Sequence, residues 1–124
     1  MKITIITVVW NNKETIKTTI DSVLGQVYKD IEYIVIDGGS TDGTVDVVKD
    51  YGSRIDKFIS EPDNGIYDAM NKGVRLATGD VIGFINSDDL LNSEDCIECI
   101  VKRFVESDAD IVYGSRFLGG GKYV

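Results

Sequence analysis

Histidine is absent from this 124-residue sequence, and proline occurs only once. Without histidine, the usual general base and metal ligand at neutral pH is missing, so acid-base or metal chemistry must use carboxylates or less common groups. Nowhere do 18 apolar residues follow one another, and no small-residue cleavage site follows the apolar start of the chain. The sequence therefore indicates neither a membrane-spanning helix nor a secretion signal.

Positive charge is also scarce. The chain has 13 basic and 21 acidic residues, a formal net charge of −8, so its average surface would repel a nucleic acid. Hydrophobic residues make up 43% of the sequence and charged residues 27%, which is typical of a soluble globular protein. At this length we expect one domain spanning residues 1–124.

Only two cysteines are present, Cys96 and Cys99, in the stretch "CIEC". Zinc and redox motifs share this spacing, but here no second cysteine pair or histidine accompanies it. The pattern favours two structural thiols in a helix. We therefore expect a reducing, cytoplasmic location.

Apolar runs of strand length alternate with segments of helical period. The runs are rich in β-branched residues and barely alternate with polar ones, as in strands covered on both faces. The expected strands are 3–10, 31–36, 55–60, 81–85 and 110–114. The expected helices carry apolar stripes over 16–27, 44–51, 66–77 and 97–105, the third closed by Gly79. This order predicts an α/β fold with a mostly parallel sheet, while the glycine-rich end, 117–124, suggests a flexible loop.

Polar residues follow each expected strand, and in a parallel sheet these positions share the edge at which ligands bind. One such stretch is "DGGSTDGT", residues 37–44, which has an acid, two glycines and then residues able to cap a helix. It lacks the spacing of a dinucleotide fingerprint, a phosphate loop or an EF-hand. A ligand-binding turn and an ordinary strand-to-helix turn remain equally open from the residues alone.

Asp88 and Asp89 follow the fourth expected strand. Adjacent carboxylates repel each other unless a cation or a hydrogen-bond network lies between them. Without histidine or thiolate ligands, such a site favours Mg²⁺, Mn²⁺ or Ca²⁺, with substrate phosphates completing the coordination of a Mg²⁺-like ion. The alternative is that both acids cap a helix beginning near residue 94.

Several ordered stretches together resemble the inverting family 2 glycosyltransferases, which have the GT-A fold. They are "TVVWNN" at 7–12, "DGGSTDGT" at 37–44, "DNGIYDAMNKG" at 63–73, "ATGDVIGFINSDD" at 77–89 and "DIVYG" at 110–114. The resemblance implies a Rossmann-like three-layer sandwich. It also implies metal-dependent transfer, with Mn²⁺ or Mg²⁺, of a sugar from a nucleoside diphosphate to a hydroxyl of a saccharide or lipid-linked glycan, as in polysaccharide biosynthesis.

The resemblance implies roles for individual positions of this sequence. It places Val8 and Trp10 at the nucleotide base, and it makes Asp37 the first acid of the base-binding turn. Asp88 and Asp89 fall in the Asp-X-Asp region, which holds the donor's ribose and the metal. Which of the two ligates the metal stays open, because Asn86 replaces the first acid of the fuller motif.

Other positions depart from the family pattern or add to it. Gly38 stands where many members have a second acid, so a base contact must come from elsewhere if it exists. Met70 stands where many have arginine, and Lys72 is the cation we expect near the phosphates in its place. Asp63 and Asp68 belong to a segment that bends over the same edge, and we expect both to contact the donor.

The family's general base and acceptor site come from the region after the metal motif, so we expect the base beyond Val124 and assign no catalytic residue. The chain is then the donor-binding half of a longer or truncated enzyme that binds nucleotide sugar and transfers poorly by itself. Membrane association of a full-length enzyme, at the cytoplasmic face, stays open. Two alternatives are a noncatalytic nucleotide-sugar-binding module and a receiver-like signalling domain, although the latter needs acids where Asn11 and Asn12 stand.

Overall fold

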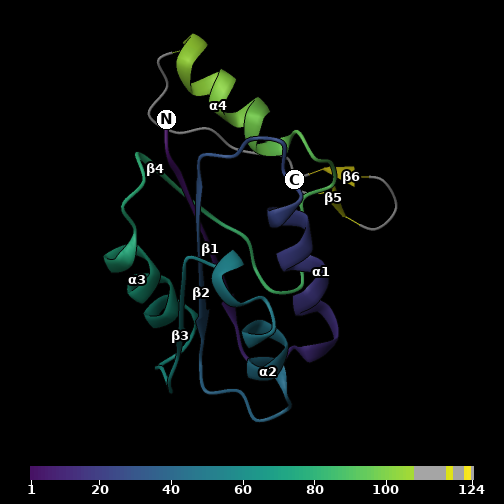
Figure 1. Ribbon diagram of the computed structural model, residues 1–124, viewed down its shortest axis with the longest axis vertical. Helices are drawn as coiled ribbons and strands as arrows, with labels where there is room; N and C mark the ends of the chain where they lie inside the picture. The colour runs from purple at the N-terminus through teal and green to yellow at the C-terminus, as the bar shows by residue number, and fades with distance from the viewer. Residues whose placement is uncertain (108–116, 119–121, 124) are drawn as a thin grey trace.

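The computed structural model describes residues 1–107, 117–118 and 122–123, and it has the α/β architecture expected from the sequence (Figure 1). The four strands of the main sheet are β1 (Ile3–Val9), β2 (Ile31–Asp37), β3 (Lys57–Ser60) and β4 (Val81–Phe84). The helices are α1 (Lys13–Leu24), α2 (Thr44–Lys49), the 3₁₀ turn η1 (Gly52–Arg54), α3 (Ile66–Leu76) and α4 (Cys96–Ser107). A separate antiparallel pair joins β5 (Phe117–Leu118) to β6 (Lys122–Tyr123).

All pairings in the main sheet are parallel, in the order β3-β2-β1-β4. The chain moves outward from β1 to β2 and β3, then returns to place β4 on the other side of β1. Val9 pairs with Asp37, and Asp37 pairs with Ser60, so these strands end at one edge. In sheets of this kind, ligands bind at the carboxyl edge where the strand order reverses, which here lies between β1 and β4.

Strand β1 is fully buried, and its side chains enter two cores on opposite faces of the sheet. Ile3, Ile5 and Val9 belong to the larger core, which α1 and α2 cover. Ile6 and Val8 belong to a smaller core beneath α3. Figure 1 shows α1 and α2 on one side of the sheet and α3 on the other, which confirms the three-layer arrangement.

The expected elements are largely present, with differences at their ends. Helix α1 stops at Leu24, and Val27, the last member of its apolar stripe, lies outside it and is exposed. The closing stretch contains the β5 and β6 pair instead of being loop throughout. The expected strand at 110–114 lies outside the described residues. Over the part of the chain that the structure describes, no helix is long and apolar enough to cross a membrane.

The expectation that Gly79 caps α3 is wrong, because the helix ends at Leu76 with Ala77 as its cap residue. Gly79 instead allows a close backbone approach to the start of β1. A Cβ at this position would lie 2.5 Å from Thr4 Oγ1 and 2.7 Å from the Thr4 nitrogen. The glycine is therefore explained by lack of space rather than by helix termination.

Glu32 holds together the edge of the sheet opposite the carboxyl ends of the strands. This buried carboxylate accepts hydrogen bonds from the hydroxyl of Thr4 at 2.8 Å and from Thr78 through both its backbone nitrogen and its hydroxyl. Lys57 Nζ lies 3.1 Å away. Burial alone would raise the pKa of Glu32, but these hydrogen bonds outweigh it and lower the pKa from 4.5 to about 2.

This shift predicts a specific loss of stability in acid. Because the folded-state pKa is below the unfolded one, the contribution of Glu32 is present above pH 4.5 and disappears as the pH falls toward 2. The shift corresponds to about 3 kcal/mol of unfolding free energy. Urea unfolding between pH 7 and pH 2.5 should show this drop in the wild type and a smaller one in Glu32→Gln. The exposed Glu14→Gln is the control, and equal pH slopes for wild type and Glu32→Gln would contradict the prediction.

Candidate functional site

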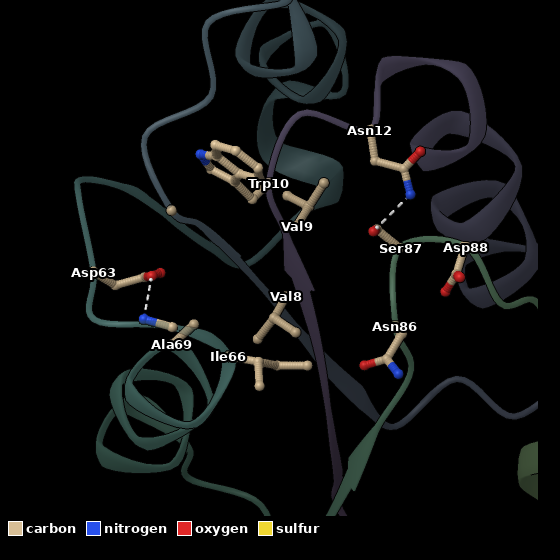
Figure 2. Close-up of a pocket in the computed structure, with 12 residues that line it drawn as sticks. Val8, Val9, Trp10, Asn12, Asp63, Ile66, Ala69, Asn86, Ser87 and Asp88 are labelled. Carbon is tan, nitrogen blue, oxygen red and sulfur yellow. Dashed lines mark hydrogen bonds between the residues drawn. The ribbon is translucent and has the colours of Figure 1, made fainter.

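A cavity of about 640 Å³ opens at the carboxyl edge of the sheet, where the strand order reverses. Its walls come from the segments that follow all four strands of the main sheet and from the start of α3. The lining residues are Val8, Val9, Trp10, Asn12, Gly38, Asp63, Gly65, Ile66, Ala69, Asn86, Ser87 and Asp88. Figure 2 shows Trp10 and Asp63 on one side, Asn86 and Asp88 on the other, and Val8 and Ile66 between them.

Trp10 is presented by a sharp turn after β1. Asn11 adopts a positive φ of 45°, which turns the chain at the strand end. The Asn11 backbone nitrogen donates to Ser40 Oγ at 2.8 Å, and its side-chain oxygen accepts from the Thr41 nitrogen at 2.7 Å. The indole beside this turn is 66% exposed, so a flat ring can stack on it without displacing core side chains.

Asp37 lies at the end of β2 and is completely buried. Its oxygens accept hydrogen bonds from the nitrogens of Gly39 at 3.0 Å and Ser40 at 2.9 Å, and from the hydroxyls of Ser40 at 2.5 Å and Ser60 at 2.8 Å. The side chain thus shapes the turn after β2 and does not line the cavity. Its direct contact with a ligand stays a prediction.

Gly38, the next residue, leaves space that the carboxylate of Asp63 fills. A Cβ on Gly38 would lie 2.8 Å from Asp63 Oδ2, closer than side chains tolerate. The other Asp63 oxygen accepts from the Gly65 nitrogen at 3.1 Å, which fixes the group beside the cavity. The acid that is missing at position 38 is therefore matched in space by an acid from the segment after β3.

Asp68 and Lys72 are on α3 but do not line the cavity. Lys72 Nζ lies 3.1 Å from Glu61 and 3.8 Å from Asp68, and it donates to the Pro62 carbonyl at 3.2 Å. Asp68 accepts from the Asn64 nitrogen at 3.0 Å. Both side chains hold the 61–65 segment against α3, and the expectation that they contact a donor stays untested.

Asp88 lines the cavity and is exposed, whereas Asp89 is half-buried and lies outside the lining. Helix α4 begins only at Cys96, so these acids do not cap it, and that alternative is wrong. The Asp89 nitrogen donates to the Asn86 carbonyl at 3.0 Å and closes a turn. Of the two acids, Asp88 is the one presented to a ligand.

The sequence-based reasoning missed the residues that hold this turn. Thr15 and Thr19 on α1 donate to the backbone carbonyls of Ser87 and Asp89. The apolar stripe of α1 was evident from its period, but Thr15, Thr19, Ser22 and Gln26 form a second, polar stripe with the same spacing. Polar residues repeating at helical spacing beside an apolar stripe were the available signal.

The cavity's charge determines which ions it can accept. Of the lining residues in the described part of the chain, only Asp63 and Asp88 are charged, and both are acidic. Among the described residues, no group of three or more histidine, cysteine or acidic side chains could enclose a metal. One or two carboxylates with open space beside them nevertheless fit a hard divalent cation whose remaining ligands are phosphate oxygens. Asp88, with Asp89 as its neighbour, can hold such an ion.

Comparisons with known proteins agree with this geometry. The sequence model described as "Glycosyl transferase family 2" matches residues 4–124. Glycosyltransferase GlyA of Streptococcus pneumoniae is 32% identical over 118 residues, covering 94% of this chain and 17% of that protein. A PGL/p-HBAD biosynthesis glycosyltransferase of Mycobacterium bovis is 34% identical over 114 residues, covering 84% of this chain and 44% of its own length. The chain thus spans less than half of either relative.

Solved structures show the same fold. S. aureus TarS 1-349 aligns with a TM-score of 0.86 at 23% identity, covering 98% of this chain and 38% of that one. The mannosyltransferase PcManGT of Pyrobaculum calidifontis, in complex with GDP-Man and Mn²⁺, aligns with a TM-score of 0.78 at 26% identity. The alignment covers 85% of this chain and 32% of that one. The fold is therefore GT-A, and the chain belongs to glycosyl transferase family 2.

Proposed function

We propose that this chain binds a nucleoside-diphosphate sugar in the cavity at the carboxyl edge and forms the donor-binding part of an inverting glycosyltransferase. The observation that carries the proposal is the cavity itself, with an exposed indole and Asp63 at one side and Asp88 at the other. A base, a diphosphate and a sugar need such an arrangement, because an aromatic ring stacks on the base and a metal-bound carboxylate faces the phosphates.

The base stacks on Trp10, with Val8 below it and the carboxylate of Asp63 as a hydrogen-bond acceptor for its N–H groups. Asp63 takes the place of the acid that Gly38 lacks, because its carboxylate lies where a side chain at position 38 would begin. Asp37 acts through the turn that it holds. Asp68 and Lys72 order the segment that carries Asp63.

Asp88 would hold the divalent cation, Mn²⁺ or Mg²⁺, with Asp89 beside it. Among the residues that the structure describes, the cavity lining carries two acids and no basic side chain, so a diphosphate would be repelled there without a cation. When bound, the cation offsets the negative charge that builds on the leaving diphosphate. This requirement supports metal dependence independently of the relatives.

In the reaction, an acceptor hydroxyl oxygen bonds to the anomeric carbon while the bond from that carbon to the diphosphate oxygen breaks. The hydroxyl proton passes to a general base, which we assign to no described residue, and the configuration inverts because one displacement occurs. The acceptor is a saccharide or a lipid-linked glycan. Cytoplasmic location and polysaccharide biosynthesis remain parts of the proposal.

A melting panel tests this function. The panel comprises UDP, GDP, ADP, CDP and TDP, each with MnCl₂ or with EDTA. A ligand at 100 times its dissociation constant stabilises the folded state by about 2.7 kcal/mol, which raises the melting temperature by several degrees. We expect one or two diphosphates to do so with Mn²⁺ and much less with EDTA. If none stabilises the chain, the proposal is wrong.

The other candidate is a noncatalytic nucleotide-sugar-binding module. Membership of glycosyl transferase family 2 excludes the receiver-like signalling domain. The two remaining candidates, the enzyme and the noncatalytic module, both bind nucleotide sugar. They differ in whether sugar is transferred. Assays of a longer protein containing this chain would separate the two candidates. The donors would be sugar derivatives of the nucleoside diphosphate selected by the panel, and only the enzyme would release that nucleoside diphosphate in proportion to added acceptor.

A further inference from the structure

One face of α1 binds the backbone of the loop that carries the acids. We call residues 86–93 the acid loop and the side chains of Thr15, Thr19, Ser22 and Gln26 the polar stripe. Thr15, Thr19 and Ser22 are spaced by four and three positions, so they share one side of the helix, and Gln26 follows just past the helix end at Leu24. Each of them hydrogen bonds to the backbone of the acid loop.

The two bonds nearest the cavity flank Asp88. Thr15 Oγ1 donates to the Ser87 carbonyl at 2.7 Å. Thr19 Oγ1 lies 2.5 Å from the Asp89 carbonyl and 2.9 Å from that of Ser87. A hydroxyl has one proton, and the shorter distance favours donation from Thr19 to Asp89, with Thr15 donating to Ser87. The backbone is then held on both sides of Asp88.

The remaining bonds fix the far part of the loop. Ser22 Oγ accepts from the Leu91 nitrogen at 3.1 Å. Gln26 Nε2 donates to the Ser93 carbonyl at 2.7 Å, and its oxygen accepts from the Ile97 nitrogen at 2.9 Å. A single amide thus joins the end of the acid loop to the first turn of α4.

Two side chains of the polar stripe are almost completely buried. Thr19 in α1 and Gln26 just beyond its end are each 1% exposed, a degree of burial more common for apolar side chains. Burying them is favourable only because their hydrogen-bonding groups meet loop atoms. Because the acid loop contributes no strand or α-helix of its own, these bonds hold its backbone, together with the bond from Asn12 Nδ2 to Ser87 Oγ at 2.9 Å and the turn closed by the Asp89 nitrogen.

We propose that Thr19 is a positioning residue that directs Asp88 toward the cation, an inference that rests on the proposed function. Its hydroxyl fixes the peptide unit after Asp89, and Thr15 fixes the one before Asp88. Groups that orient a metal ligand typically alter metal affinity by about 10- to 100-fold when removed. The same hydroxyl has no contact with the part of the cavity beside Trp10.

The test compares Thr19→Val, which keeps the shape and loses the hydroxyl, with Thr19→Ser, which keeps it. Calorimetry measures binding of the diphosphate selected by the panel, with MnCl₂, and of the corresponding nucleoside without metal. We expect Thr19→Val to weaken the Mn²⁺-dependent binding about tenfold. Nucleoside binding should be unchanged, and Thr19→Ser should bind like the wild type. Thr18→Val, on the exposed side of the same helix, is the matched control.

Equal loss of nucleoside and diphosphate binding in Thr19→Val, or wild-type binding of both, would overturn the proposal. If Thr19→Val does not fold, Thr15→Val at a half-buried position gives the same comparison. Amide hydrogen exchange of residues 87–89 supplies a readout that needs no ligand, and exchange should be faster in the valine variants alone. If the wild type binds no nucleotide, the proposed function fails, and the exchange rates still decide whether Thr19 holds the loop.

Discussion

Replacing Asp88 with asparagine should weaken Mn²⁺-dependent binding of the nucleoside diphosphate by at least about 100-fold, or about 2.7 kcal/mol. Asparagine keeps the size of the side chain but removes the charge that a hard cation requires. Within the described ranges, Asp63 is the one other acid that lines the cavity, and it lies across the cavity from Asp88 (Figure 2), so it cannot replace the lost ligand. The effect should therefore fall almost entirely on the metal-dependent part of binding.

Calorimetric titration with MnCl₂ and with EDTA measures this effect. The melting temperature of Asp88→Asn should match that of the wild type, because the side chain is exposed. Asp46→Asn, on the exposed surface of α2, controls for the change in net charge. Asp89→Asn should weaken binding less than Asp88→Asn does. The reverse order would show that the cavity-lining acid is not the main ligand.

Replacing Asp37 with alanine should lower the free energy of unfolding by about 3 kcal/mol and also weaken nucleotide binding. Four donors, two backbone nitrogens and two hydroxyls, would lose the acceptor that they share. The turn that carries Gly38 would then loosen, and with it the cavity wall against which Asp63 packs. Asp37→Asn, which keeps one acceptor oxygen, should be intermediate.

Urea unfolding and calorimetry of the same variants separate two roles for Asp37. Asp46→Ala is a control in which an exposed acid is truncated to the same size. A structural role predicts that stability and binding fall together. If Asp37→Ala unfolded like the wild type yet lost binding, Asp37 would contact the nucleotide directly, as the family resemblance alone suggests.

The fold could be predicted because its signals are local and redundant. Strand β1 is covered on both faces, and such strands appear in sequence as unbroken runs of β-branched residues. Strict alternation with helical segments then fixes a parallel sheet and gathers the residues after each strand at one edge. Asp63 and Asp88 follow expected strands and were therefore placed at this edge, whereas Trp10 was placed there by the family resemblance. All three line the cavity, and their contacts with a ligand stay predictions.

Side-chain direction could not be predicted in the same way. The sequence places Asp37 at the edge, but it does not show that neighbouring donors occupy its oxygens and bury it. Likewise, the role of Gly79 depends on contact with Thr4, a residue distant in sequence. The polar stripe on α1 has meaning only once the acid loop lies against it. Each of these features depends on tertiary contacts, which residue spacing does not encode.

Three parts of the molecule form the proposed site. Turns after β1 and β2 are tied together through Asn11, and they present Trp10 and leave room for Asp63. The polar stripe of α1 holds the acid loop on the other side of β1. A ligand that spans the cavity would therefore contact groups held by two hydrogen-bond networks, one beside the base and one beside the phosphates. Asn12 joins the two networks, because its Nδ2 donates to Ser87 Oγ at 2.9 Å.

The central claim is that Asp88 and a diphosphate share one divalent cation. Crystals grown with MnCl₂ and the diphosphate selected by the melting panel would test it by anomalous scattering from manganese. We predict an anomalous peak within coordination distance of the Asp88 carboxylate and of diphosphate oxygens, with the base against Trp10. A manganese peak that Asp88 does not touch, or a nucleotide bound outside this cavity, would contradict the account.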